Sequence, residues 1–177
     1  FWKPVVDYVG GTIVECNTAY EGARDTTKRH LQLFQDHGWT KYFPVDLLDA
    51  QGPDLELEIP EGKQIQKNYV GKDIVNYDSM LVLSHFKGHP MGGYGGALKQ
   101  LSIGVASAYG KKFIHGAGDV EILWKADHDS FLEAMADAAL AAGDVGAGTG
   151  VQLHARLIGD DLHRAAAFRM LEVGNQA

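Results

Sequence analysis

Histidines and lysines gather in the middle of the chain, in a stretch that carries no acidic residue. The basic residues of this stretch, 79–118, are His85, Lys87, His89, Lys99, Lys111, Lys112 and His115. The whole chain has 23 Asp and Glu in 177 residues, so about five acids would be expected in a window of this length. Imidazoles transfer protons or bind transition metals, and lysine amines bind anions or act as nucleophiles. The pattern predicts a site for an anion or a metal cofactor.

Glycines accompany these basic residues. Gly92, Gly93, Gly95 and Gly96 follow a continuous apolar run at 80–83, which is typical of a strand buried on both faces. Ligands of open α/β sheets bind at the carboxyl ends of strands, where backbone N–H groups can approach a phosphate or carboxylate. We therefore expect the four glycines, together with Lys87 and Lys99, to contact a bound anion or cofactor.

Short motifs that identify common enzyme classes are absent from this region. The Gly-Lys pairs are not followed by the Ser or Thr of a phosphate-binding P-loop, and Leu98 stands where a dinucleotide fingerprint needs glycine. His85 and His89 have the spacing of a zinc-protease helix, but Phe86 replaces the glutamate that such a helix requires. No Gly-x-Ser-x-Gly elbow is present. The chemistry must therefore be inferred from the individual side chains.

The hydrophobic pattern predicts the elements that would position these residues. Helices are expected at 24–37, at 97–103, from a capping box at Ser130 to about Ala142, and near 161–171, with strands at 12–16, 45–48, 55–59, 80–83 and 151–158. Strands that alternate with helices predict an α/β layered domain with a parallel or mixed central sheet flanked by helices. We expect one α/β domain at 1–141, a flexible Gly/Ala-rich connector at 142–150 and a C-terminal segment at 151–177 packed on the same domain.

Composition limits the partners. A net charge of −7, a pI near 5.5 and 45% hydrophobic residues describe a globular protein without the basic face that nucleic acid or an anionic membrane requires. No apolar run approaches the roughly 20 residues of a membrane helix, so we expect a cytoplasmic location. The chain does not begin with Met, and we expect it to be a fragment of a longer protein. The expected partner is a small anionic ligand or cofactor.

Two segments resemble a known family. The stretches "ECNTAYEGARDTTKRHLQLFQDHGW" and "SMLVLSHFKGHPMGGYGGALKQLSIGVASAYGKK" are similar to the family called domain of unknown function 362, over about residues 1–140. Its members are described as iron–sulfur or ferredoxin-like centre proteins, so the resemblance implies a 4Fe-4S cofactor and a ferredoxin-like module as partner. The chain has one cysteine, Cys16, whereas such a cluster takes about four thiolates. The cluster ligands implied by the resemblance are therefore absent from this chain.

A more distant similarity concerns the nickel-pincer lactate racemase family. His89, Lys99 and His115 are separated by ten and sixteen residues, which resembles that family's spacing. The resemblance implies that Lys99 attaches or contacts a nucleotide-derived cofactor, that His115 ligates nickel or another metal, and that His89 transfers protons.

Three functions remain open from the sequence. The first is an iron–sulfur-associated, redox-related α/β domain with an anion or metal-cofactor site at the glycine-rich loop. The second is a racemase or epimerase acting on a hydroxy acid, with His85, His89 and Lys99 as catalytic candidates. The third is a non-catalytic ligand-binding or interaction module.

Overall fold

The structure is a computed structural model that describes residues 3–52, 54–77, 79–85, 87–149, 152–158 and 168–171, with the backbone alone at 83–85, 87, 143–149, 152–158 and 168–171. The helices and helical turns are α1 (Lys3–Tyr8), α2 (Thr27–Asp36), η1 (Trp39–Lys41), η2 (Lys72–Asn76), α3 (Ala97–Lys99), η3 (Gln100–Gly104), α4 (Ala108–His115), η4 (Val120–Ile122) and α5 (His128–Thr149). The strands are β1 (Thr12–Glu15), β2 (Val45–Leu47), β3 (Leu55–Glu58), β4 (Lys67–Val70), β5 (Ser79–His85), β6 (Lys87–His89), β7 (Gly93–Gly95), β8 (Gln152–Ile158) and β9 (Phe168–Leu171).

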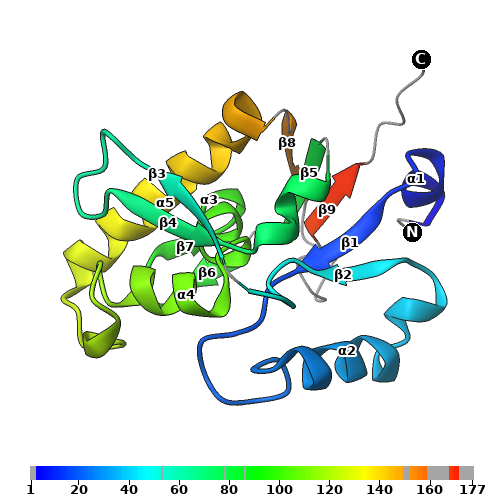
Figure 1. Ribbon diagram of the computed structural model, residues 1–177, viewed down its shortest axis with the longest axis horizontal. Coiled ribbons are helices and arrows are strands. Elements are labelled where there is room, and N and C mark those ends of the chain that lie inside the picture. Colours follow the sequence, from blue (N-terminus) through cyan, green and yellow to red (C-terminus); the bar gives the residue numbers. More distant parts are fainter. Residues whose placement is uncertain are drawn as a thin grey trace.

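A mixed five-stranded sheet forms the centre of the molecule, with the order β2-β1-β9-β5-β8 (Figure 1). β1 is parallel to β2 and β5 is parallel to β8, while β9 lies between the two pairs and is antiparallel to both of its neighbours. Because β1 and β5 both run opposite to β9, the carboxyl ends of β1, β2, β5 and β8 lie at one edge of the sheet. The predicted α/β fold with a mixed sheet is confirmed.

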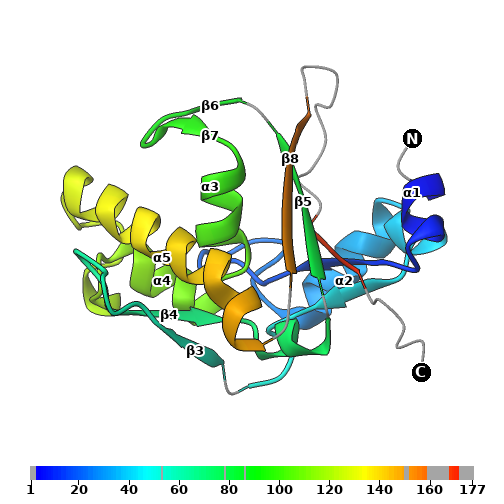
Figure 2. The ribbon, with the colours of Figure 1, turned by 90° about the horizontal axis from the view of Figure 1, so that it is seen from above.

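Helices cover both faces of this sheet (Figure 2). Successive residues of a strand point to opposite faces, and Ile13 and Val14 of β1 are both buried. Ile13 packs in a cluster with Phe34 of α2, whereas Val14 packs in a cluster with Met80 and Val82 of β5 and with Ala142 of α5. Burial on both faces explains why the strands are rich in β-branched and aliphatic residues.

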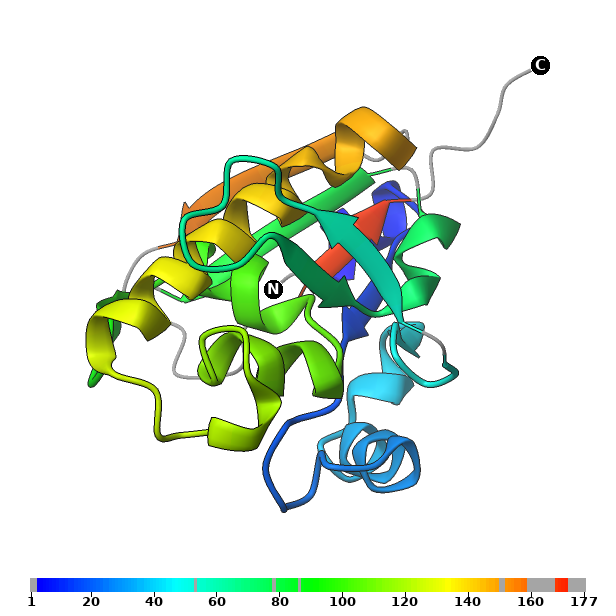
Figure 3. The same ribbon diagram turned by 60° about the vertical axis from the view of Figure 1, so that its left-hand side comes forward.

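A second layer of packing joins α4 and α5 to the β3–β4 hairpin (Figure 3). Its buried members include Ile65, Ile114 and Phe131. The buried carboxylate of Asp137 on α5 accepts hydrogen bonds from the backbone N–H groups of Gln64 (2.7 Å) and Ile65 (3.0 Å), in the loop between β3 and β4. This layer holds α4, which carries three of the basic residues of the acid-free stretch, against the rest of the domain.

The helix predicted from Ser130 differs from α5 at both ends. The structure starts α5 at His128, and Asp127 accepts a hydrogen bond from the Ser130 backbone N–H (3.0 Å), so Asp127 rather than Ser130 performs the capping. The helix also continues to Thr149, so residues 142–149 of the predicted flexible connector at 142–150 are helical. Glycine costs about 1 kcal/mol relative to alanine in a helix, but extension of an existing helix adds one hydrogen bond per residue.

The end of the described chain is also extended where the sequence predicted helix. Residues 168–171 of the helix expected near 161–171 form β9, and the rest of that prediction, like most of the segment after 158, lies outside the described residues. β9 pairs with β1 on one side and β5 on the other, so it satisfies backbone groups that would otherwise be open in the middle of the sheet. This long-range pairing overrides the local helical pattern. In the part of the chain that the structure describes, no helix is long and apolar enough to span a membrane.

Candidate functional site

A cavity of about 370 Å³ lies beside the carboxyl ends of β1 and β5. Small-molecule sites commonly measure about 300–1,000 Å³. Its walls come from the segment after β1, the β6–β7 hairpin after β5, the helical stretch of α3 and η3, the helix α4 and the residue Trp124. Among the described side chains that line it, the acidic one is Glu15, and the basic ones are Arg24, His89, Lys99, Lys111 and His115.

The β6–β7 hairpin replaces the open loop that the glycines suggested. Its turn lies between His89 and Gly93, which pair with each other, and Gly93 has a φ of +65°, a conformation that favours glycine. The hairpin folds the chain back over the cavity so that His89, Pro90 and Met91 line it. The glycines therefore shape the turn that positions His89.

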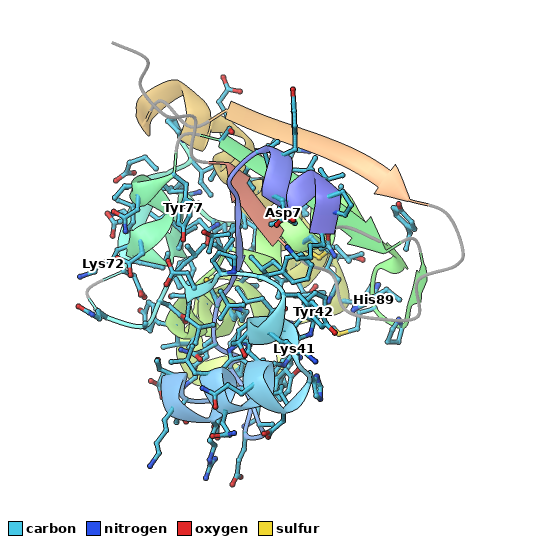
Figure 4. The ribbon with its side chains drawn as sticks, turned by 90° about the vertical axis from the view of Figure 1, so that its right-hand side faces the viewer. Asp7, Lys41, Tyr42, Lys72, Tyr77 and His89 are labelled. Carbon is cyan, nitrogen blue, oxygen red and sulfur yellow. The ribbon has the colours of Figure 1, made fainter. Side chains whose placement is uncertain are left out.

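His89 lies at this turn (Figure 4), where two backbone groups hold its ring. Its Nδ1 accepts hydrogen bonds from the N–H groups of Gly92 (3.0 Å) and Met91 (3.3 Å). A nitrogen that accepts hydrogen bonds cannot carry the proton of a neutral imidazole, so that proton is on Nε2. Neutral His89 is thus a hydrogen-bond donor through Nε2.

His115 has the opposite arrangement. Its Nδ1 lies 2.7 Å from the carbonyl oxygen of Lys111, which can only accept, so Nδ1 donates and the neutral ring carries a lone pair on Nε2. The ring packs against Trp124 and Phe131, at centroid distances of 4.4 and 5.0 Å. Burial, assisted by the positive charge of Lys99, lowers the pKa of His115, and the Lys111 carbonyl opposes this shift. At neutral pH His115 is therefore a neutral base.

Two lysines complete the basic side of the cavity. Lys99 is half-buried at the end of α3, and Lys111 is buried on α4, one turn before His115. The Nζ of Lys111 donates a hydrogen bond to the Ala106 carbonyl oxygen (2.5 Å). Burial lowers the pKa of Lys111, while Cys16 and Asp49 act in the opposite direction.

Glu15 supplies the acidic group at the end of β1. Its Oε2 lies 3.0 Å from Nε2 of the buried His30 and 3.5 Å from Nη1 of Arg24. The other ring nitrogen of His30 lies 3.2 Å from Oδ1 of Asn17, so His30 bridges the end of β1 and the residue that follows Cys16. These contacts hold Glu15 in place and offset its negative charge.

Cys16 and Asp49 lie where β1 meets α4. The buried Cys16 thiol donates to the Val105 carbonyl oxygen (3.3 Å), and burial raises the pKa of Cys16 to about 12. Asp49 accepts from the N–H of Asn17 (2.9 and 3.1 Å to its two oxygens) and from the N–H of Ala108 (2.9 Å). The carboxylate therefore joins the end of β1 to the first turn of α4.

The structure brings three of the predicted site residues to one cavity, namely His89, Lys99 and His115. His85 ends β5 and Lys87 begins β6, but their side chains lie outside the described residues. The four predicted glycines are Gly92, Gly93, Gly95 and Gly96, and none is among the described residues that line the cavity. The N–H of Gly92 is already bonded to His89. Contact between these glycines and a ligand remains a prediction.

The described side chains do not fit a metal centre. Among them, no three His, Cys, Asp or Glu groups lie close enough together to hold a metal ion, so we assign no metal to His115. A 4Fe-4S cluster needs about four thiolates, and the one cysteine of the chain is a buried thiol with a raised pKa.

Sequence reasoning missed several cavity residues. Lys111 was one of several lysines in the acid-free stretch, yet its i, i+4 relation to His115 on a helix would have placed both on one face. Glu15 and Arg24 are distant in sequence from the glycine-rich region, and only the adjacency of β1 and β5 around β9 brings them to the site.

Comparison with known proteins identifies the family. The family model described as "Domain of unknown function (DUF362)" matches residues 1–158, which include every wall of the cavity and reach past residue 140, where the sequence resemblance was expected to end. No curated protein and no solved structure matches the chain, and similarity to the lactate racemases is not shown. The chain belongs to the DUF362 family of domains of unknown function.

Proposed function

We propose that this domain binds a small organic anion, a compound with a carboxylate or phosphate group, in the cavity at the carboxyl ends of β1 and β5. The observation that carries the proposal is the lining of the cavity. His89, Lys99, Lys111 and His115 share it, and the acid among the described lining residues, Glu15, is paired with Arg24 and His30.

Local charge favours an anion although the chain as a whole is acidic. The net charge of −7 is that of the whole chain, whereas the lining of the cavity includes the lysines Lys99 and Lys111 in a partly desolvated space. Electrostatic attraction is stronger in such a space than in water, so a carboxylate or phosphate that accepts a hydrogen bond from the Lys99 ammonium would be bound more strongly here than on an exposed surface.

A proton-transfer enzyme, such as a racemase or epimerase, is the second candidate. The two histidines of the cavity have complementary tautomers, because His89 donates through Nε2 and His115 accepts at Nε2. An acid and a base on one ligand are what proton exchange at a carbon requires. Release of deuterium from a ligand labelled at the carbon beside its carboxylate would support this candidate.

Calorimetric titration with a panel of small carboxylates and phosphates tests the binding proposal. Replacing Lys99 by Met should weaken binding about tenfold or more, since hydrogen bonds to charged groups contribute roughly 1.5–3 kcal/mol. Lys112→Met is the matched control, because Lys112 is exposed on α4 and does not line the cavity. The proposal is wrong if no anion in the panel binds, or if both variants bind as tightly as the parent protein.

A further inference from the structure

Lys111 is a buried amine in the wall of the cavity. The residue is 7% exposed, it lines the cavity from α4, and its Nζ donates a hydrogen bond to the carbonyl oxygen of Ala106. Lysine is almost never fully buried unless it is paired with a carboxylate. The environment of Nζ therefore decides what this residue does.

The acidic neighbours of Lys111 are engaged elsewhere. Asp49 accepts from two backbone N–H groups, and Glu15 is bonded to His30 and lies near Arg24. Among the described residues, Lys111 forms no ion pair with either carboxylate. An amine that is buried without an ion pair is favoured in its neutral form, which agrees with the lowered pKa of Lys111.

We propose that Lys111 is a nucleophile that forms an imine with a carbonyl carbon of the bound ligand, and that the ligand is an oxo acid. An oxo acid carries an aldehyde or ketone next to, or near, its carboxylate. The inference rests on the proposed function, because the carboxylate is the group that the basic side of the cavity would hold. A desolvated lysine with an accessible cavity on one side is the arrangement that imine-forming sites use.

The reaction requires no oxidant or reductant. The amine nitrogen attacks the carbonyl carbon, and the carbonyl electron pair moves to oxygen, which takes a proton. Loss of the hydroxyl group then forms the C=N bond, so the two amine protons and the carbonyl oxygen leave as water. His89 offers an N–H that can protonate the oxygen, and Nε2 of His115 can accept a proton from the attacking nitrogen.

Reductive trapping tests this inference on the intact chain. The protein is incubated at pH 7.5 with glyoxylate as the probe and sodium cyanoborohydride, and the modified lysines are located by peptide mass spectrometry. We expect saturable modification of Lys111, about tenfold or more faster than that of the exposed Lys112, because binding places the aldehyde beside the amine. Equal, non-saturating modification of both lysines would overturn the inference.

A second measurement separates this inference from the proposed function. Glycolate has the carboxylate of glyoxylate but no carbonyl group, so its binding, measured by calorimetry, reports anion recognition alone. If glycolate binds and Lys111 is not trapped, the imine is wrong and anion binding stands. If neither glycolate nor any other anion of the panel binds and Lys111 is not trapped, both are wrong. Lys111→Met should abolish trapping at this position. If that variant does not fold, the peptide mass spectrometry of the trapped wild-type protein still shows whether Lys111 is the modified lysine.

Discussion

Replacing Asp49 by Ala should destabilise the protein and remove the hydrogen bonds that connect the end of β1 with the start of α4, two segments that line the cavity. Asp49 accepts hydrogen bonds from the N–H of Asn17, which follows β1, and from the N–H of Ala108, the first residue of α4. Alanine leaves both N–H groups without this acceptor in a partly buried place. The helix that carries Lys111 and His115 then loses its tie to β1.

The expected loss follows from these two donors. A buried donor left without a partner costs about 1–3 kcal/mol, so the loss of this acceptor for two donors should lower the free energy of unfolding by about 2–6 kcal/mol in urea denaturation. Asp7→Ala is the control, because Asp7 pairs with Lys3 on an exposed face of α1 and such a pair contributes at most about 1 kcal/mol. The anion affinity of the cavity should fall in Asp49→Ala and remain unchanged in Asp7→Ala.

The outcome that refutes this reasoning is specific. If Asp49→Ala unfolds at the same urea concentration as the parent protein, with the same slope, the two N–H groups have other partners and Asp49 does not join β1 to α4. A loss of stability with unchanged anion affinity would show that the hydrogen bonds of Asp49 stabilise the fold but do not position the residues that line the cavity.

Two further predictions concern the packing of α4 and the protonation of the cavity. Gly110→Ala should lower the free energy of unfolding by about 1–3 kcal/mol, because a Cβ there would lie 1.9 Å from the Tyr69 carbonyl oxygen; Gly52→Ala, with open space around it, should be nearly neutral. Equal urea midpoints for the two variants would contradict the close contact of α4 and β4. The ring of His115 should stay neutral in NMR titrations below the pH at which free histidine takes up a proton, because its pKa is lowered. The unfolded chain binds this proton at higher pH than the native protein, so the stability contributed by the neutral ring should fall as the pH drops below the ordinary histidine pKa, and His115→Gln should remove that part of the pH dependence.

The sequence predicted elements whose pattern is local and missed those that depend on distant pairing. The β-branched run after Gly11 and the apolar run at 80–83 identify β1 and β5, because burial on both faces requires such residues. β9 has no comparable local signal, and it exists as a strand because two open strand edges are available to it. The continuation of α5 to Thr149 likewise reflects an established helix that extends through glycines.

The candidate site shows the same division. The acid-free stretch and the spacing of His89, Lys99 and His115 predicted three residues that do share a cavity. Glu15 could not be predicted as a neighbour of His89, because β1 and β5 are joined in the sheet through β9, the last strand that the structure describes. The tautomers of the histidines depend on backbone hydrogen bonds that no sequence pattern specifies.

Alkaline pH offers a test of the neutral state of the buried pair formed by Cys16 and Lys111. The native pKa of Cys16 is about 12 and its ordinary value is 9.0, so between these values the unfolded chain releases a proton that the native protein keeps. The stability that this thiol contributes is complete below pH 9 and is lost as the pH rises, at about 1.4 kcal/mol per pH unit for one proton. Comparing the free energy of unfolding at pH 8 and pH 10, Cys16→Ala should therefore lose about 1.4 kcal/mol less than the parent protein, and titration of the other groups cancels in the difference.

An equal loss in the two proteins would mean that Cys16 ionises in the native state as readily as in the unfolded chain. A thiolate at this position would favour the ammonium form of Lys111, since the negative charge of Cys16 acts to raise the pKa of that lysine. At pH 10 the amine would then be a poorer nucleophile than it is beside a neutral thiol. The alkaline stability of Cys16→Ala thus bears on imine formation above pH 9 without any ligand, and in that range trapping at Lys111 and a protonated Cys16 should be observed together.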